Sequence, residues 1–349
     1  MGKRVNQQWC LKARPQGQIE ESHFEWRRAP IPELRKGGLL VRTIYLSLDP
    51  TNRIWMSDID QYMAPVQVGE VMRGGTIGVV EESNDPKVAV GDLVQGVWGW
   101  QEFAVISAGS VRNTLPKNDS FPLTAYMGLL GSIGATAYFG LLDVGKPLKG
   151  ETLVVTGAAG AVGSIAGQIG KIKGCRVVGI AGSSEKCRWI TDELKFDASV
   201  NYKTENVLEA LKEQCPNGID VDFENVGGTI FDDILTLINR NARIALCGLI
   251  SQYTHIDDQK PFPGPVMFRN VLMKRARIEG FIVTDFLSRF PEAFSALRKW
   301  HAAGLLKYRV DVVQGLENAA TAVNKLFDGS NQGKLIVQVS DDPTSEMLA

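Results

Sequence analysis

The chain has few of the side chains that metal centres and hydrolytic triads need. It contains three histidines, and none is spaced from a cysteine or from another histidine as metal ligands are. The five cysteines are dispersed without a C-x-x-C pair, and the G-x-S-x-G turn of serine hydrolases is missing. We therefore expect no bound metal and no serine hydrolase. An odd, scattered set of cysteines favours reduced thiols and a cytoplasmic location.

The chain also lacks an excess of charge and a long lipid-like segment. Its 349 residues carry a formal net charge of -1 at pH 7, so we expect no nucleic-acid partner. The start of the chain, MGKRVNQQW, has no apolar segment of the signal-peptide type. Residues 120–142 and 152–170 are free of charge, but they are rich in small and hydroxyl side chains. This composition favours a buried core over a membrane span.

Residues 151–186 have the pattern of a strand, a glycine-rich turn, a helix and a second strand. The turn, GAAGAVG, has glycine at positions 157, 160 and 163. Glycines at this spacing permit a sharp turn, the approach of a pyrophosphate and close packing of helix on strand. The helix N-terminus adds free N–H groups and a positive dipole end. The stretch predicts dinucleotide binding, and the alternative is a tight turn without a ligand.

The end of the second strand distinguishes the two nicotinamide cofactors. An NAD site needs an acidic side chain there for the ribose hydroxyls. This chain has Gly182 followed by Ser183, Ser184, Glu185 and Lys186. Hydroxyls and a lysine suit a 2′-phosphate, and Glu185 can point to solvent from the next helix. We predict NADP(H), with Ser183 and Lys186 at the phosphate; the alternative is that Lys186 is an ordinary surface lysine.

The rest of the pattern predicts an α/β protein with two domains. Residues 1–125 contain short strands punctuated by glycine and proline, as in a compact, barrel-like β domain. Residues 126–305 alternate strands and helices, which predicts a doubly wound parallel sheet. Residues 306–340 are expected to complete the β domain, and residues 341–349 to form a mobile end. We expect strands over residues 38–48, 74–81, 88–97, 98–106, 152–156, 175–180, 199–202, 218–225, 242–247, 277–283, 307–313 and 334–339, and helices over residues 207–213, 231–237, 291–303 and 316–327.

Ligands of doubly wound sheets bind at the carboxyl ends of the strands. Asn225, Cys247, Gly248 and residues 281–283 follow such ends and are expected to face the cofactor. Tyr253 lies just beyond the fifth strand, where a nicotinamide and its substrate meet. A phenol there can hydrogen-bond an oxygen that becomes negative during hydride transfer. The alternative is a loop tyrosine that only packs.

Seven motifs together resemble one enzyme family along residues 7–339. They are VRTIYLSLDP (41–50), GAAGAVG (157–163), KGCRVVGIAGSSEKCR (173–188), FENVGG (223–228), ARIALCGLISQY (242–253), GFIV (280–283) and SNQGKLIV (330–337). The chain resembles the zinc-independent medium-chain dehydrogenases/reductases, in the branch of the prostaglandin reductases, plant alkenal double-bond reductases and bacterial NADPH-dependent curcumin reductases. The resemblance implies a GroES-like β domain with a Rossmann-type domain, in a homodimer. It also implies NADPH-dependent reduction of the C=C bond of an enone or enal.

The resemblance further implies which residues form the site. Tyr253 is linked to substrate binding and enolate stabilisation, and Tyr62 matches another tyrosine of the substrate pocket. The family usually has tyrosine and methionine after Asp-Pro, where this chain has Thr51 and Asn52, so an aromatic wall is absent. The implied nucleotide contacts are Ala159, Gly160, Ala161, Val162, Gly163, Lys186, Tyr202, Asn225, Cys247, Gly248, Ile250, Ser251, Tyr253, Phe281, Ile282, Val283 and Asn331.

Three other functions stay open at this level. A quinone reductase on the same fold would use the same cofactor site. An alcohol dehydrogenase is disfavoured because its zinc ligands are absent from the sequence. A non-catalytic NADPH-binding protein would keep the nucleotide turn without turnover. A panel of enones, enals and quinones with NADPH distinguishes these possibilities.

Overall fold

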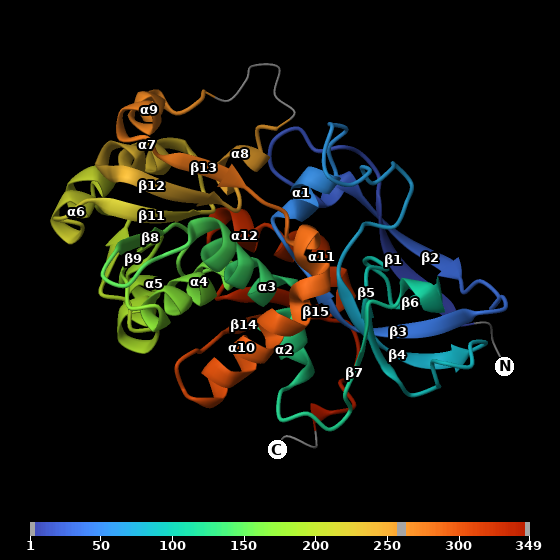
Figure 1. The fold of residues 1–349 in the computed structure, drawn as a ribbon. Coiled ribbons are helices and arrows are strands. Elements are labelled where there is room, and N and C mark those ends of the chain that lie inside the picture. Colours follow the sequence, from blue (N-terminus) through green and yellow to red (C-terminus); the bar gives the residue numbers. More distant parts are fainter. Residues whose placement is uncertain (1–3, 257–262, 346–349) are drawn as a thin grey trace.

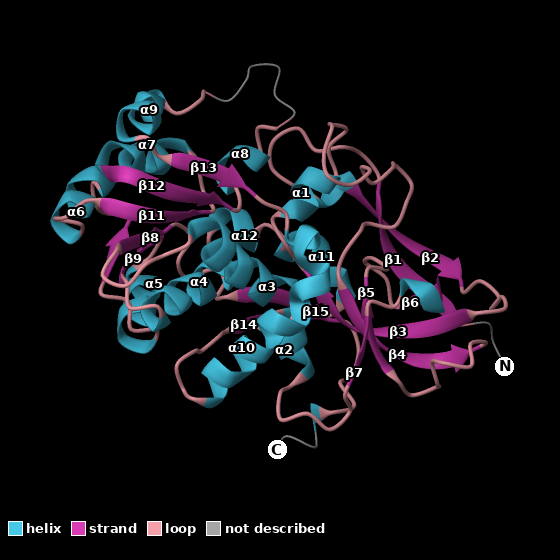
Figure 2. Ribbon diagram, in the orientation of Figure 1, coloured by secondary structure: helices cyan, strands magenta, loops and turns pink. Residues whose placement is uncertain are grey.

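The structure, a computed structural model, describes residues 4–256 and 263–345. Six parallel strands form one sheet in the order β10-β9-β8-β11-β12-β13 (Figure 1). Helices cover both of its faces (Figure 2), which explains the apolar character of the strands. The strand order reverses between β8 and β11, where such sheets bind ligands. The strands are β8 (Thr152–Val155), β9 (Arg176–Ala181), β10 (Ala198–Asn201), β11 (Ile219–Glu224), β12 (Ile238–Leu246) and β13 (Arg277–Gly280).

The second large sheet joins the two ends of the chain. β15 pairs with β3 in antiparallel register and with β14 in parallel, so strands from residues 310–338 extend a sheet built by the first third of the chain. A separate hairpin pairs β1 with β2. The strands are β1 (Val5–Leu11), β2 (Phe24–Pro30), β3 (Gly38–Ser47), β4 (Thr76–Ser83), β5 (Leu93–Gly96), β6 (Phe103–Ser107), β7 (Asn113–Leu115), β14 (Val310–Gln314) and β15 (Lys334–Gln338).

One buried apolar cluster connects the two sheets. It contains Ile44 and Ile77 from the β domain, Leu129 from the connecting segment, and Val155 and Phe223 from the parallel sheet. The two domains therefore pack on a shared core. The α-helices are α1 (Thr51–Trp55), α2 (Leu123–Met127), α3 (Ser132–Phe139), α4 (Ala161–Ile172), α5 (Ser184–Arg188), α6 (Val207–Gln214), α7 (Gly228–Leu237), α8 (Ile250–Tyr253), α9 (Arg269–Lys274), α10 (Phe290–Ala302), α11 (Ala319–Ala322) and α12 (Lys325–Asp328).

Several expected strands are shorter than predicted. The strand expected over residues 88–97 is confined to β5, because Ala89–Asp92 form a turn with Gly91 at φ 84°. The strand expected over residues 98–106 starts only at Phe103, after Gly99 at φ 88°. β13 ends at Gly280, because the neighbouring strand β12 ends at its register partner Leu246 and the ladder has no further partner.

The C-terminal region also differs from the prediction. The helix expected over residues 316–327 is interrupted at Val323–Asn324, where the Asn324 amide donates to the carbonyl of Ile19 (2.9 Å). β14 begins at Val310, three residues later than expected. Within residues 341–345, expected in a mobile end, Tyr45 donates to Asp342 (3.1 Å) and Thr344 is buried, while Asp341, Pro343 and Ser345 are exposed. Residues 346–349 lie outside the described residues. No helix in the described part of the chain has the length and apolar character needed to cross a membrane.

Candidate functional site

The turn between β8 and α4 has room only for glycine at its crucial positions. Gly157 has φ 58°, a conformation that glycine adopts without strain. A Cβ at Gly163 would lie 2.4 Å from the carbonyl oxygen of Gly157. Gly160 precedes the first turn of α4, and no side chain caps that turn. The N–H groups at the start of this twelve-residue helix are therefore available to a phosphate.

The end of the cavity that is predicted to bind the adenosine has Lys186 in its wall and Lys203 nearby. The Lys186 ammonium is buried and donates to the carbonyl of Gly329 (2.8 Å), while Lys203 donates to the carbonyl of Asp328 (3.3 Å). Burial, followed by repulsion from Lys203, lowers the pKa of Lys186. A Cβ at Gly182 would lie 2.8 Å from the Tyr202 ring. The place of the acidic residue of NAD sites is thus taken by a tyrosine ring and a nearby cation.

Ser183, predicted at the phosphate, caps the helix that carries Lys186. Its hydroxyl oxygen caps α5 by accepting the backbone N–H of Lys186 (3.2 Å), and the residue does not line the cavity. The predicted phosphate site therefore depends on Lys186, while Ser183 fixes the helix turn that carries it. The capping bond uses only the acceptor side of the hydroxyl.

The loop after β11 is tied to the glycine-rich turn through Thr156. The Asn225 amide donates to the Thr156 carbonyl, and the Asn225 backbone N–H donates to the Thr156 hydroxyl, each over 2.7 Å. That hydroxyl donates to Glu224 (2.9 Å), whose same oxygen accepts the backbone N–H of Gly227 (2.8 Å). Glu224 therefore holds the two loops that approach the cofactor in one arrangement.

Glu224 lies beside a second buried acid, Asp222. Both side chains are almost fully buried, and Asp222 accepts no hydrogen bond from a donor among the described residues; its carboxyl shares a hydrogen bond with Glu224 instead. Burial raises the pKa of both carboxyls, and the charge of Glu224 raises that of Asp222 further. Since Glu224 accepts three hydrogen bonds, it is the better site for the negative charge. Asp222 is then the neutral acid of the pair.

Tyr253, at the end of α8, presents a phenol prepared to donate. Its oxygen accepts the backbone N–H of Leu249 (3.1 Å). Burial raises its pKa to about 12, and Cys247 and Tyr62 contribute to the shift. The phenol is therefore protonated at neutral pH, and its proton is not used by the Leu249 contact. Burial also raises the pKa of the Cys247 thiol to about 12, which leaves it uncharged and a poor nucleophile.

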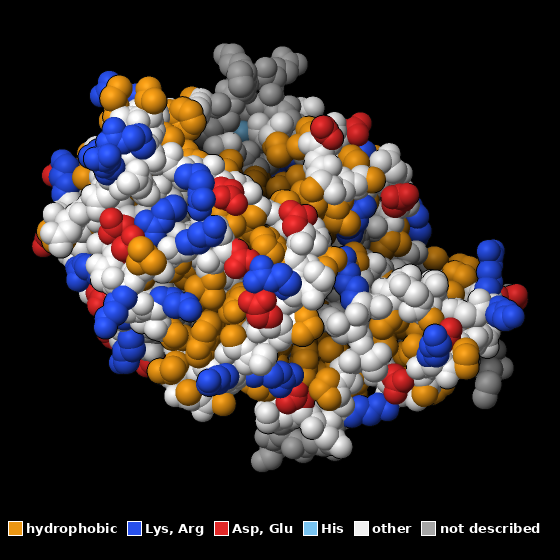
Figure 3. Space-filling view, viewed as in Figure 1, with side chains coloured by type: hydrophobic (Ala, Val, Ile, Leu, Met, Phe, Trp, Pro, Cys, Tyr) orange, Lys and Arg blue, Asp and Glu red, His pale blue; other side chains and the backbone are white. Residues whose placement is uncertain are grey.

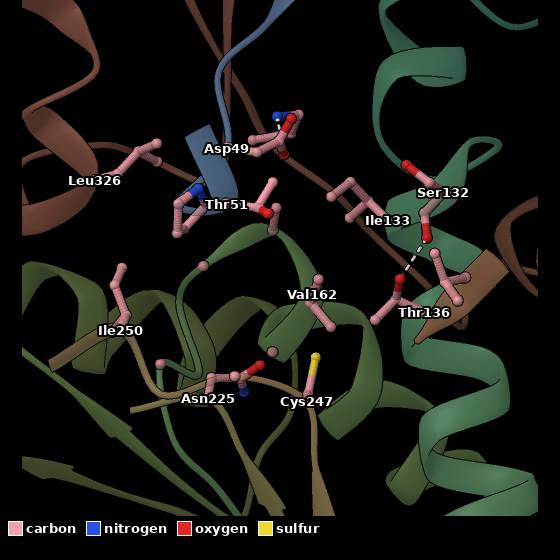
Figure 4. Close-up of a pocket in the computed structure, with 18 of the residues that line it drawn as sticks. Asp49, Thr51, Ser132, Ile133, Thr136, Val162, Asn225, Cys247, Ile250 and Leu326 are labelled. Carbon is pink, nitrogen blue, oxygen red and sulfur yellow. Dashed lines mark hydrogen bonds and ion pairs between the residues drawn. The ribbon is translucent and has the colours of Figure 1, made fainter. Parts of the chain in front are cut away.

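The opposite wall carries a second group of hydroxyls. The Thr51 hydroxyl lies 2.5 Å from the Tyr62 hydroxyl, which accepts the indole N–H of Trp55 (3.1 Å). Figure 4 shows Thr51 across the pocket from Asn225 and Cys247, with Ile133 to one side. The surrounding lining is largely apolar: it includes Ile54, Met63, Ile133, Phe281, Val283, Leu287, Phe290 and Phe294.

One cavity of about 1540 Å³ connects these parts. It runs from the adenosine end, along the glycine-rich turn, to the Tyr253 and Thr51 walls. The residues named from the sequence that line it are Thr51, Tyr62, Ala159, Gly160, Ala161, Val162, Gly163, Lys186, Tyr202, Asn225, Cys247, Gly248, Ile250, Ser251, Tyr253, Phe281, Ile282, Val283 and Asn331. Only Ser183 of the named residues lies outside the lining. The cavity is large and elongated enough for a dinucleotide and a substrate together.

Sequence reasoning missed a buried ion pair in the cavity wall. The Lys334 ammonium donates to the carbonyl of Leu48 (2.7 Å) and to Asp49 (2.8 Å), and burial lowers its pKa. Gly333, next to Lys334, forms a bridge with Gly160. The pair therefore joins the start of α1 to the glycine-rich turn. Both residues stand in motifs noted above, but their contact spans 285 positions, which no local pattern reveals.

The chain matches two sequence families. Residues 7–114 match the family described as the N-terminal domain of oxidoreductase, and residues 161–299 match the one described as zinc-binding dehydrogenase. Among residues 4–256 and 263–345, no three His, Cys, Asp or Glu side chains come together as a metal site requires.

Full-length relatives are similar to this chain. The NADPH-dependent curcumin reductase of Escherichia coli (strain K12) is 43% identical, covering 97% of this chain and 99% of that protein. The NADP(+)-dependent 2-alkenal reductase of Nicotiana tabacum is 40% identical, covering 96% and 98%. Prostaglandin reductase 1 of Bos taurus is 37% identical, covering 95% and 98%. The crystal structure of CurA in complex with NADPH from Vibrio vulnificus is 43% identical, with a TM-score of 0.90, and covers 96% of this chain and 100% of that one.

Proposed function

Since the chain belongs to the NADP-dependent medium-chain dehydrogenases/reductases, in the branch of the curcumin, 2-alkenal and prostaglandin reductases, we propose that it reduces the C=C bond of α,β-unsaturated ketones and aldehydes with NADPH. The observation that carries this proposal is the Tyr253 phenol. Its proton is free, and it faces the same cavity as the glycine-rich turn. A proton donor at that point stabilises an oxygen that becomes negative.

The residues of the cavity suit NADPH. Uncapped N–H groups of α4 and the space left by Gly160 accommodate the pyrophosphate. Lys186, with Lys203 nearby, supplies positive charge for the 2′-phosphate, and Tyr202 occupies the place of an acidic residue. Asn225 and Val162 lie together in the pocket (Figure 4), where the nicotinamide end is expected. When bound, NADPH supplies the hydride for the substrate's β-carbon.

Tyr253 polarises the substrate and stabilises the enolate. Its hydroxyl donates to the carbonyl oxygen of the enone, which makes the β-carbon electrophilic. The same hydrogen bond becomes stronger when the oxygen carries the enolate charge, so the interaction lowers the barrier rather than only improving binding. The apolar walls formed by residues such as Ile133 and Phe281 exclude water, which strengthens the hydrogen bond from Tyr253 to the substrate oxygen.

We also propose that the enzyme works without zinc, in the cytoplasm, as a homodimer. All five cysteines are free thiols, which fits a reducing compartment. β13 is the edge strand of its sheet, and the nearby side chains of Val266, Phe268, Leu272 and Met273 are exposed; Figure 3 shows apolar atoms gathered over α9. An open strand edge beside an apolar patch is a surface for a second copy of the chain.

The dimer proposal is tested by light scattering after size-exclusion chromatography. The variant Leu272→Glu/Met273→Glu places charge in the apolar patch, and we expect it to be monomeric. Leu305→Glu changes another exposed leucine and serves as the matched control. A wild-type protein that is monomeric at micromolar concentration contradicts the dimer but leaves the enzymatic proposal intact.

The enzymatic proposal is tested by NADPH oxidation with a short enone, a long-chain enal and a quinone in parallel, with NADH as the control. Turnover of an enone or enal with NADPH, and much slower turnover with NADH, is the expected result. Quinone turnover alone would identify a quinone reductase instead. Tight NADPH binding without turnover of any acceptor would favour a non-catalytic role.

A further inference from the structure

Three residues on the substrate wall form a directed chain of hydrogen bonds. An indole N–H can only donate, so the Trp55 contact makes the Tyr62 oxygen an acceptor. The remaining contact joins the hydroxyls of Tyr62 and Thr51 over 2.5 Å. A phenol is a stronger acid than an aliphatic alcohol, and the alcohol oxygen is the better acceptor. Tyr62 therefore donates to Thr51, and the Thr51 proton is left for a group in the cavity.

The chain of hydroxyls lies on the side of the cavity that the cofactor loops do not occupy. Thr51 begins α1, in the β domain, whereas Asn225 and Cys247 follow strands of the parallel sheet. Figure 4 shows these groups on opposite sides of the pocket. A substrate held between them has one face toward the nicotinamide and the other toward Thr51. Tyr62 also lies near enough to Tyr253 to raise the pKa of that phenol, and both tyrosines line the same cavity.

Tyr62 has an accessible surface, and Thr51 less of one. Tyr62 lines the cavity and is 46% exposed, while its hydroxyl is held by Trp55 and Thr51. A proton lost from the phenol can therefore be replaced from water that reaches this surface. Thr51 is half-buried at the start of α1, and its hydroxyl is in contact with that of Tyr62. Protons can therefore enter at Tyr62, pass to Thr51 and leave into the cavity.

We propose that Thr51 and Tyr62 form the proton relay that completes the reduction, by protonating the substrate's α-carbon on the face opposite to hydride addition. This inference rests on the proposed enone reduction. After hydride has reached the β-carbon, the enolate electron pair forms a new C–H bond at the α-carbon as the Thr51 O–H bond breaks. The Tyr62 proton moves to the Thr51 oxygen, and water returns a proton to Tyr62. Two electrons come from NADPH and one proton comes from solvent, so the step is balanced.

In this proposal the residues of the two walls have different roles in the reaction. Tyr253 holds the carbonyl oxygen, and its proton stays with that hydrogen bond until the enolate collapses to the ketone. Thr51 is the catalytic proton donor at carbon, and Tyr62 acts through Thr51. The Thr51 hydroxyl, which replaces the usual aromatic residue of the family at this position, thus gains a specific role.

The test uses the full chain with NADPH and an α-methyl-substituted enone in deuterated water. The product's α-carbon is then stereogenic and carries solvent deuterium. We compare wild type, Thr51→Val, Thr51→Ser and Tyr62→Phe. Three quantities are measured: the turnover number, the configuration at the α-carbon, and the NADPH dissociation constant from nucleotide fluorescence.

The wild type is expected to deliver deuterium to one α-face, opposite to the hydride. Thr51→Val should lower the turnover number by about 10²-fold and yield a mixture of α-configurations, because protonation then comes from disordered water. Thr51→Ser should recover most of the turnover and the single configuration. Tyr62→Phe should reproduce the Val defect, and all variants should bind NADPH as the wild type does.

Two outcomes would overturn the relay. One is a Thr51→Val enzyme with wild-type turnover and configuration. The other is a Tyr62→Phe enzyme with an unchanged product, which serves as the independent test if the Val variant does not fold. A wild-type enzyme that reduces no enone would instead contradict the proposed function itself, so the two failures are distinguishable.

Discussion

The two walls of the cavity are built by different means. The cofactor wall is built around a backbone turn: Gly157 and Gly163 have conformations or neighbours that leave no room for a side chain, and the buried Glu224 ties the loops together. The substrate wall consists of side chains, and Thr51 and Tyr62 meet there through one hydroxyl contact. A wall formed by backbone is rigid, and it can bind the phosphates that every dinucleotide has. A wall of side chains can change with the substrate while the fold remains.

The strongest test of the cofactor wall is Gly163→Ala. The added Cβ would lie 2.4 Å from the Gly157 carbonyl oxygen, so the turn must shift away from its phosphate-binding geometry. We expect NADPH affinity to fall by more than about 10²-fold, measured by nucleotide fluorescence. Gly109→Ala, whose Cβ would meet only ordinary contacts, is the control. Normal NADPH affinity in Gly163→Ala would show that the turn accommodates the added Cβ without losing its phosphate-binding geometry.

Tyr253→Phe separates chemistry from cofactor binding. Removal of one donor to a developing oxyanion typically lowers the turnover number by about 10²- to 10³-fold. NADPH binding should be unchanged, because the substitution keeps the ring and removes one structural hydrogen bond, that from the Leu249 N–H to the phenol oxygen. Steady-state kinetics and nucleotide fluorescence measure the two quantities separately. Unchanged turnover would remove Tyr253 from the mechanism.

Lys186→Gln tests whether the adenosine end discriminates between cofactors. Loss of the charge should weaken NADPH binding by about tenfold, because a hydrogen bond to a charged group contributes about 1.5–3 kcal/mol. NADH binding should change little, since that cofactor lacks the 2′-phosphate. The ratio of the two dissociation constants is the measurement. Lys212→Gln, at a solvent-exposed ion pair with Glu209, is the control, and equal losses for both cofactors would contradict the assignment.

The smallest expected effect concerns the buried acids. Because folding raises the pKa of Asp222, the folded protein holds that proton more tightly than the unfolded chain does. Stability is therefore greatest below the ordinary Asp pKa and declines as pH rises toward the raised value. Asp222→Asn should remove this decline, which for one proton is at most about 1.4 kcal/mol per pH unit, in urea unfolding at several pH values. Identical pH profiles for wild type and variant would contradict a neutral Asp222.

The difference between the walls also explains what the sequence could predict. The parallel strands and the glycine-rich turn follow from local apolar patterns and glycine spacing, so their positions required no tertiary information. Lys334 and Asp49 could not be paired in this way, because their contact depends on β15 lying next to β3. Asp222 and Glu224 did offer a signal, because acids alternate with apolar residues along β11, at Asp220, Asp222 and Glu224. The capping role of Ser183 is visible only once α5 is located.

The substrate wall was harder to predict for a related reason. α1 has only five residues, too short for helical periodicity to appear. Tyr62 lies in a loop, and its distance from Thr51 depends on how that loop folds back over α1. The resemblance to a family identified both positions, but only the structure shows that their hydroxyls are in contact.

The central claim is that hydride reaches the β-carbon of a C=C bond, and isotope transfer tests it most directly. NADPH carrying deuterium at the transferable position is incubated with an enone and the enzyme, and the product is analysed by NMR. We expect a saturated ketone with deuterium at its β-carbon. An allylic alcohol with deuterium on the carbon that bears the hydroxyl, or a product without deuterium, would contradict hydride transfer to the β-carbon.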